Sequence, residues 1–189
     1  MKIALVGMPG CGKSTVGRHL ANLLGMRFVD LDADIERRLG EAIRPFFERE
    51  GEAAFRELEH QSLADLMSEP AEMVLATGGG AVLREDNRNL LQTSSTVLYL
   101  RSTPEELFRR LRHDTKRPLL QVNDPMGRLR DLLKQRDPVY RSTAHYVIET
   151  GRPSVTSLVN MVLMQLELAG VVDNGRVPSS VSPITKTQR

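Results

Sequence analysis

Short runs of apolar and β-branched residues recur along the chain, separated by longer stretches of mixed polarity. A continuous apolar run of about 4–8 residues, bounded by turn residues, is typical of a strand buried on both faces. We therefore predict strands at Lys2–Gly7, Arg27–Leu31, Glu72–Thr77, Thr96–Arg101 and Tyr146–Thr150.

Between the predicted strands, apolar residues return every three or four positions, which is the period of an amphipathic helix. Val16, Leu20 and Leu24, for example, fall on one helical face. Alternating strands and helices favour a parallel sheet covered on both faces, with ligands bound at the carboxyl ends of the strands. The helices are expected at Lys13–Leu24, Ala33–Leu39, Pro45–Glu50, Glu52–Ser68, Glu85–Gln92, Pro104–Arg112, Met126–Arg136 and Ser154–Leu168.

Two stretches lack an apolar period. His113–Gly127 is polar and lies between two predicted helices, and a loop of this length favours a functional lid over a plain connector. Val171–Arg189 contains prolines, serines and threonines and almost no large apolar residues, so we expect a disordered tail that is dispensable for chemistry. Residues 1–170 would then form one domain, which also agrees with a chain of 189 residues.

The first predicted strand runs directly into the segment Gly-Met-Pro-Gly-Cys-Gly-Lys-Ser-Thr at residues 7–15. This segment fits the phosphate-binding loop pattern, in which two glycines flank four residues and are followed by lysine and serine or threonine. Its glycines let the backbone turn N–H groups toward an anion, Lys13 can reach the β- and γ-phosphates, and the Ser14 hydroxyl can bind Mg²⁺. The alternative, a glycine-rich turn without a ligand, is disfavoured by the strand before it and the helix after it. The chain is therefore predicted to bind a nucleoside triphosphate.

The composition is that of a soluble globular protein, with 40% hydrophobic and 26% charged residues. No run approaches the roughly 18 apolar residues of a membrane span, and no signal peptide precedes the first strand. A single cysteine, Cys11, agrees with a reducing cytoplasm. Of the 26 basic residues all but 5 are arginine, whose planar fork suits phosphate and carboxylate. Because acidic residues are interleaved with them, we rank small anionic ligands above nucleic acid as partners.

Carboxylates follow the second predicted strand. Asp30 and Asp32 are two residues apart, so in a strand both side chains would project toward the phosphate-binding loop. One carboxylate could position Mg²⁺, and the other could accept the hydrogen bond or the proton of an attacking hydroxyl. Helix capping is the alternative, and we favour it for Asp34 rather than for Asp32.

Three consecutive glycines, Gly78–Gly80, follow the third predicted strand. Glycine removes side chains where another group approaches the backbone, and the exposed N–H groups could bind a carboxylate or a hydroxyl. A mobile hinge is the second interpretation. Arg117, in the predicted lid, supplies a cation that could close onto a transferring phosphoryl group. Arg56 and Arg136, judged by their own neighbours, would be surface arginines.

Taken together and in this order, the motifs resemble the shikimate kinase family over roughly Lys2–Leu168. The phosphate-binding loop alone is common to many unrelated NTPases, whereas its combination with the aspartate pair, the triple glycine and the lid motif is specific to the family. The matching segments are Gly7–Thr15, Phe28–Asp32 with Ile35-Glu36, Gly51-Glu52 followed by Phe55-Arg56 and Glu59, Gly78–Gly80, Arg117–Leu120, and Arg136 with Pro138 and Tyr140.

The resemblance implies a three-layer α/β fold like that of nucleoside monophosphate kinases, with five parallel strands in the order 2-3-1-4-5, a lid and a substrate-binding region. It also implies an enzyme that transfers the γ-phosphoryl group of ATP to the 3-hydroxyl of shikimate, giving shikimate 3-phosphate and ADP for chorismate and aromatic amino-acid biosynthesis. ATP, Mg²⁺ and shikimate would be its small-molecule partners. We expect a cytoplasmic monomer without nucleic-acid or membrane partners.

The resemblance further implies a role for each matching residue. Asp32 would bind shikimate hydroxyls and orient or deprotonate the attacking one, while Arg56 and Arg136 would clamp the shikimate carboxylate. Ser14 and Asp30 would serve the magnesium. The implied substrate-binding residues are Asp32, Arg56, Gly78, Gly79, Gly80 and Arg136.

On the nucleotide side, the resemblance implies that Lys13 and Arg117 stabilise charge on the transferring phosphoryl group. Arg110 and Pro153 match positions that flank the adenine in the family. The implied nucleotide-binding residues are Gly10, Cys11, Gly12, Lys13, Ser14, Thr15, Arg110, Arg117 and Pro153.

Two rival functions remain at this point. Another small kinase, for gluconate or a nucleoside monophosphate, would account for the phosphate-binding loop and the lid, but not for the set of Arg56, Gly78–Gly80 and Arg136. A nucleotide-dependent switch or nucleic-acid-associated protein is a rival of another class. It is disfavoured because the chain has no Asn/Thr-Lys-x-Asp stretch of the kind that reads guanine.

Overall fold

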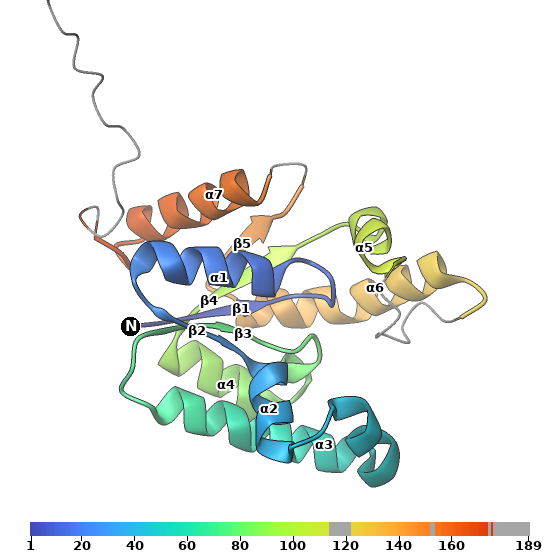
Figure 1. The fold of residues 1–189 in the computed structure, drawn as a ribbon. Helices are drawn as coiled ribbons and strands as arrows, with labels where there is room; N and C mark the ends of the chain where they lie inside the picture. The colour runs from blue at the N-terminus through green and yellow to red at the C-terminus, as the bar shows by residue number, and fades with distance from the viewer. Residues whose placement is uncertain (114–121, 152–153, 174, 176–189) are drawn as a thin grey trace, which may run out of the picture.

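Five parallel strands form one sheet in the computed structural model of this protein, which describes residues 1–113, 122–151, 154–173 and 175 (Figure 1). The sheet order is β2-β3-β1-β4-β5, as predicted. The strands are β1 (Lys2–Val6), β2 (Arg27–Asp30), β3 (Met73–Ala76), β4 (Thr96–Arg101) and β5 (Tyr146–Glu149). The central strands are almost wholly buried, because helices cover both faces of a parallel sheet.

Helices pack on the two faces of this sheet and complete three layers. Helices α1 (Lys13–Leu24) and α7 (Val155–Leu168) contact each other on one face. The other face is covered by α3 (Ile43–Ser68), α4 (Glu85–Ser94) and α6 (Pro125–Thr143), with α4 in contact with both of the others. The remaining helices are α2 (Leu31–Leu39), which packs on α3, and α5 (Pro104–Leu111), which packs on α6. A short 3₁₀ turn, η1 (Ala81–Leu83), follows the three glycines after β3.

The start of α2 differs from the prediction. We placed Leu31 in the strand and began the helix at Ala33, whereas α2 begins at Leu31 and Asp30 is its N-cap, with Oδ1 accepting the Ala33 N–H at 3.2 Å. The predicted cap at Asp34 is therefore wrong. Asp34 lies inside the first turn and pairs with Arg37 and Arg38, whose guanidinium groups hold the pKa of the Asp34 carboxyl below its usual value against the opposing effect of burial.

Helix α6 is longer than predicted. We ended it at Arg136 because proline lacks the N–H that a helix interior needs, but it continues through Pro138 to Thr143. Tyr140 gives a physical reason for the continuation. It is fully buried, and its ring lies 5.0 Å from that of Tyr99 on β4, so packing against the sheet outweighs the cost of the proline.

Helix α3 keeps the predicted break between Glu50 and Glu52. Gly51 has φ 86° and ψ 174°, a backbone conformation open to glycine, and it interrupts the helical geometry between the two predicted segments. The second segment carries Arg56, so this turn sets the direction from which that arginine enters the site.

The predicted lid and tail fall largely outside the described residues. Residues 114–121 of the lid are not described, and its last part, from Pro125 to Gly127, forms the first turn of α6. Of the tail, Val172 is buried and its N–H donates to the carbonyl of Leu166, so the packed body extends two residues beyond the predicted boundary. None of the helices described in the chain is long and apolar enough to cross a membrane.

Candidate active site

The phosphate-binding loop (residues 7–15) connects the carboxyl end of β1 to α1. Gly10 has φ 82° and Gly12 has φ 99°, values that side chains other than glycine rarely adopt. A Cβ at Gly10 would also lie 2.7 Å from Cγ of Leu111. The backbone of this loop therefore requires glycine at these positions, as its sequence pattern predicts.

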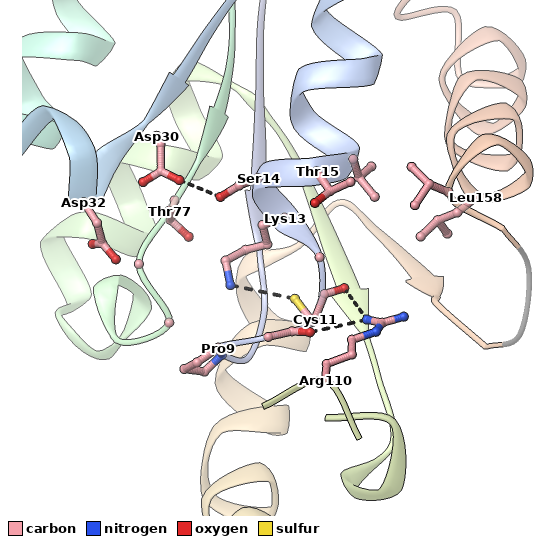
Figure 2. Close-up of a pocket in the computed structure, with 16 residues that line it drawn as sticks. Pro9, Cys11, Lys13, Ser14, Thr15, Asp30, Asp32, Thr77, Arg110 and Leu158 are labelled. Atoms are coloured by element: carbon pink, nitrogen blue, oxygen red, sulfur yellow. Dashed lines mark hydrogen bonds between the residues drawn. The ribbon is translucent and has the colours of Figure 1, made fainter. Parts of the chain in front are cut away.

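Lys13 lies inside the curve of this loop. Its Nζ donates to the carbonyls of Gly7 at 2.8 Å and Met8 at 3.0 Å, and it lies 3.7 Å from Sγ of Cys11 (Figure 2). The side chain is only 8% exposed. No carboxylate of the described residues pairs with this ammonium group, which carbonyls of its own loop hold in place, so its charge remains available to a bound anion.

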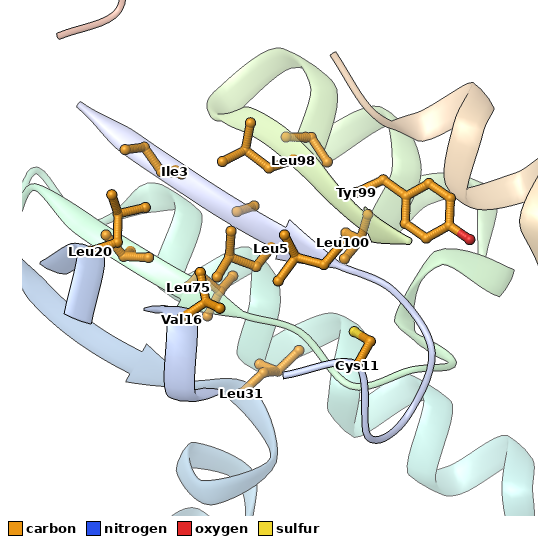
Figure 3. Packing of buried hydrophobic residues seen from close by; sticks show 14 of the residues in the cluster. Ile3, Leu5, Cys11, Val16, Leu20, Leu31, Leu75, Leu98, Tyr99 and Leu100 are labelled. Atoms are coloured by element: carbon orange, nitrogen blue, oxygen red, sulfur yellow. The ribbon is translucent and has the colours of Figure 1, made fainter. Parts of the chain in front are cut away.

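Cys11 takes part in the loop through its backbone. Its side chain is fully buried and belongs to the hydrophobic core, together with Leu5 of β1 and Leu31 of α2 (Figure 3). Its carbonyl accepts a hydrogen bond of 2.9 Å from Nη1 of Arg110, on α5. The structure thus joins Arg110 to the phosphate-binding loop, across about a hundred residues of sequence.

The two residues predicted to serve magnesium are in direct contact. The hydroxyl of Ser14 donates to Oδ2 of Asp30 at 2.5 Å. Hydroxyl and carboxylate oxygens are the ligands that Mg²⁺ prefers, and this ion keeps several waters rather than needing a cage of protein ligands. Among the described residues no group of three or more His, Cys, Asp or Glu side chains is placed to hold a metal ion.

Asp32 faces the same cleft from the first turn of α2. Figure 2 shows Asp30, Asp32 and Thr77 on one side of the phosphate-binding loop and Leu158 on the other. The predicted sharing of a strand face is wrong, because Asp32 belongs to a helix, but the helix still brings it to the cleft. The cleft has a volume of about 550 Å³ and is lined by Pro9 to Val16, Asp30, Asp32, Thr77, Gly78, Gly79, Arg110, Val155 and Leu158.

The triple-glycine loop (Gly78–Gly80) lies against the protein's own side chains. A Cβ at Gly80 would lie 2.4 Å from Nη2 of Arg56, and one at Gly78 would lie 2.8 Å from Oδ1 of Asp32. A Cβ at Gly79 would lie 2.7 Å from Cδ of Pro9. The predicted close approach to the backbone is therefore confirmed, and it explains all three glycines without any positive φ.

Arg56 pairs with a buried carboxylate, Glu59, whose pKa also responds to the charge of Arg136. Nη1 of Arg56 donates to Oε1 of Glu59 at 2.8 Å, and Glu59 is 1% exposed. Burial raises the pKa of Glu59, the charges of Arg56 and Arg136 oppose that rise, and the charge of Asp32 adds to it. These groups come from α2, α3 and α6, so tertiary packing turns two apparent surface arginines into one charged cluster beside Asp32.

Glu59 is a site residue that our reasoning from residue types missed. A signal was present, because Glu59 follows Arg56 by three positions on the helix face that also holds Phe55 and Leu63. The apolar wall formed by Val155 and Leu158 gave no such signal, since these residues look like ordinary parts of a helix stripe. Arg117 and Pro153 lie outside the described residues.

The carboxyl ends of the 2-3-1-4-5 sheet bring together the phosphate-binding loop, the Ser14–Asp30 pair and the carboxylate–arginine cluster. This combination is that of a small kinase that phosphorylates a compact anionic acceptor. Comparison with known proteins narrows this class. The family model described as shikimate kinase matches residues 9–167. The chain belongs to the shikimate kinase family and is an ATP-dependent phosphotransferase.

Individual relatives agree with this assignment. A shikimate kinase of Paracidovorax citrulli is 54% identical over 173 residues, which cover 90% of this chain and 94% of the relative. The solved structure of a shikimate kinase from Acinetobacter baumannii in complex with shikimate has a TM-score of 0.84 and 48% identity, covering 91% of this chain and 95% of its own. A gluconokinase from Sinorhizobium meliloti, at 17% identity and a TM-score of 0.58 over 89% of this chain and 92% of its own, shares the fold alone.

Proposed function

We propose that this protein transfers the γ-phosphoryl group of ATP to the 3-hydroxyl of shikimate, giving shikimate 3-phosphate and ADP in chorismate and aromatic amino-acid biosynthesis. One observation carries the proposal. Nη1 of Arg56 donates to the buried carboxylate of Glu59, the charges of Arg136 and Asp32 act on the same carboxylate, and Asp32 also lines the cleft of the phosphate-binding loop. Two guanidinium groups, one of them balanced by Glu59, suit a small acid that also carries hydroxyl groups.

On the nucleotide side, N–H groups from Gly10 to Thr15 hold the phosphates, and Lys13 exchanges its carbonyl contacts for β- and γ-phosphate oxygens. Arg110 and Pro153 flank the adenine. Arg117 adds positive charge at the transferring group. The contacts of Arg110 with the carbonyls of Gly10 and Cys11 support its place beside the nucleotide.

Ser14 and Asp30 are the residues that would hold Mg²⁺, directly or through its waters. Their contact of 2.5 Å supplies the hydroxyl and carboxylate oxygens that the ion prefers. When bound, the ion supplies positive charge that neutralises the phosphate oxygens.

On the acceptor side, Arg56 and Arg136 hold the carboxylate of shikimate, and Gly78–Gly80 line the same pocket. Asp32 accepts the hydrogen bond of the 3-hydroxyl and aims its oxygen at the γ-phosphorus. The new oxygen–phosphorus bond forms as the bond from the γ-phosphorus to the bridging oxygen of ADP breaks, and the hydroxyl proton leaves along the hydrogen bond to Asp32.

We further propose that the packed body through Val172 acts as one catalytic domain of a cytoplasmic monomer, with the lid between residue 113 and the start of α6 and a tail after the body.

The test is a coupled ADP-release assay with ATP and Mg²⁺, in which shikimate, gluconate and nucleoside monophosphates are compared as acceptors. We expect turnover when shikimate is the acceptor and no turnover with gluconate or the nucleoside monophosphates. Turnover with gluconate or a nucleotide and none with shikimate would overturn the proposal and leave only a kinase of the same fold.

A further inference from the structure

The carbonyl groups of the triple-glycine loop are all engaged by other parts of the protein. The carbonyl of Gly78 accepts the N–H of Ala81 at 3.2 Å, and that of Gly80 accepts the N–H of Leu83 at 3.1 Å. The carbonyl of Gly79 instead accepts a hydrogen bond from a side chain, the hydroxyl of Tyr140, at 2.5 Å. Each carbonyl direction in this loop is therefore set by a hydrogen bond.

The N–H groups of the loop differ from its carbonyls. Among the residues that the structure describes, the N–H groups of Gly79 and Gly80 donate to no protein acceptor. A trans peptide is planar, so its N–H points away from its C=O. By holding the Gly79 carbonyl, Tyr140 thus directs the N–H of Gly80 to the opposite side of that peptide.

Tyr140 is itself firmly placed. It is fully buried, and its ring packs on Tyr99. Burial raises the pKa of the Tyr140 hydroxyl, and the charges of Arg136 and Arg56 oppose that rise. The hydroxyl therefore remains a neutral donor, one helical turn from Arg136 and bonded to the loop that lies against Arg56.

The geometry points to Tyr140 as a positioning residue for the acid substrate, which fixes the peptide between Gly79 and Gly80 and so aims the Gly80 N–H at the ligand held by Arg56 and Arg136. Three glycines in a row have the largest conformational freedom that a chain can lose on ordering. A loop of this composition needs an external anchor to present one N–H in one direction. The inference rests on the proposed function, because it assigns the acid to this side of the cleft.

The test is Tyr140→Phe, which removes the hydroxyl and keeps the ring on Tyr99. We expect the KM for shikimate to rise by about tenfold, the KM for ATP to stay within about twofold, and the protein to remain folded. Equal changes in the two KM values, or no change in either, would contradict a positioning role.

Tyr99→Phe is the matched control, since it removes a hydroxyl from the same ring pair. That hydroxyl donates to Asp137, which keeps its bonds from Arg101 and Arg141. The control is expected to keep both KM values of the wild type. If Tyr99→Phe raised the KM for shikimate as much as Tyr140→Phe, the rise would come from weaker packing of the ring pair. That result would overturn the inference.

A second measurement uses the wild-type protein and so does not depend on the folding of a variant. The amide resonance of Gly80 is expected to shift when shikimate is added, and an unchanged resonance at saturating shikimate would overturn the inference. Wild-type protein that does not phosphorylate shikimate would instead refute the proposed function. Active wild-type protein with an unaffected Tyr140→Phe variant would refute only the role of Tyr140.

Discussion

The two glycine-rich loops of the cleft use glycine for different physical reasons. In the phosphate-binding loop, Gly10 and Gly12 have positive φ, so the backbone conformation itself requires them. In the triple-glycine loop, φ is not positive, and each missing Cβ makes room for Asp32, Pro9 or Arg56. The conformation of the first loop depends on its own nine residues. The second becomes a binding surface only through helices that are distant in sequence.

This difference divides the cleft into two sides that respond differently to substitution. The side of the phosphate-binding loop serves every acceptor that the enzyme could phosphorylate, because every transfer needs the triphosphate. The side of the triple-glycine loop, in the function proposed above, distinguishes one acceptor from another. Substitutions on one side should therefore leave ligand binding on the other side unchanged.

The largest effect is expected for Lys13→Met on the side of the phosphate-binding loop. Loss of its charge removes stabilisation of the transferring phosphoryl group, and kcat should fall by about 10²–10³-fold or more. Steady-state ADP release gives kcat, and shikimate binding by calorimetry checks the other side, which should be unaffected. Lys134→Met, at an exposed lysine of α6, is the matched control and should keep the wild-type kcat.

Asp32→Asn acts between the two sides. The amide keeps the shape but loses the charge that receives the hydroxyl proton, so kcat should fall by about 10²-fold or more while ATP affinity is nearly unchanged. The comparison variant is Asp34→Asn on the same helix, which breaks pairs with Arg37 and Arg38 and should lower stability rather than turnover. A near-wild-type kcat for Asp32→Asn would contradict its role.

Gly80→Ala tests the use of glycine for space. Its Cβ would lie 2.4 Å from Nη2 of Arg56, and the long arginine side chain can move, so the KM for shikimate should rise by about fivefold with little loss of stability. Gly40→Ala tests the use of glycine for conformation. Gly40 has φ 69° and nothing within 4 Å of its Cβ position, so this variant should lose about 1 kcal/mol of stability and keep its KM. Kinetics and thermal unfolding of both variants would show whether the distinction holds.

Glu59 gives the cluster a pH-dependent stability. Because burial raises its pKa in the folded state above the ordinary value of 4.5, the folded protein binds more protons there than the unfolded chain. The free energy of unfolding should therefore fall as pH rises from about 4.5 through the folded pKa, and Glu59→Gln should remove this contribution. Urea unfolding from about pH 5 to about pH 8 measures it.

Glu57 is the internal control for the direction in which the free energy of unfolding changes with pH. A hydrogen bond from Arg84 lowers the pKa of Glu57, so any contribution from this exposed residue is lost as pH falls. A Glu59→Gln variant with the same pH profile as the wild type would show that Glu59 does not titrate as its burial requires.

The smallest effect is expected for removal of residues 176–189, to which we assign no role. The kcat and both KM values should stay within about twofold of the wild type, because the last described residue that lines the cleft is Leu158. The cut falls after Gly175 rather than at Val171, since Val172 is part of the core. A large loss of kcat would give the tail a role in catalysis.

Short-range physics made much of the molecule predictable from its residues. Apolar runs and helical periods located all five strands and most helices, and the positive φ values of the phosphate-binding loop follow from its own glycines. The end of α6 was not predictable in this way. The local signal at Pro138 favours a stop, and only the burial of Tyr140 against the sheet outweighs it.

The amino-acid order alone determined the fold class, the triphosphate loop and the motifs of the family, because each depends on neighbours within a few residues. Tertiary structure alone decided that the charges of Arg56, Arg136 and Asp32 act on one buried glutamate, and that Tyr140 bonds to Gly79, 61 positions away. The physical reason is the distance in sequence over which the interactions act. Dihedral preferences and apolar periodicity depend on residues that are close in sequence, whereas the convergence of side chains from separate helices depends on how those helices pack.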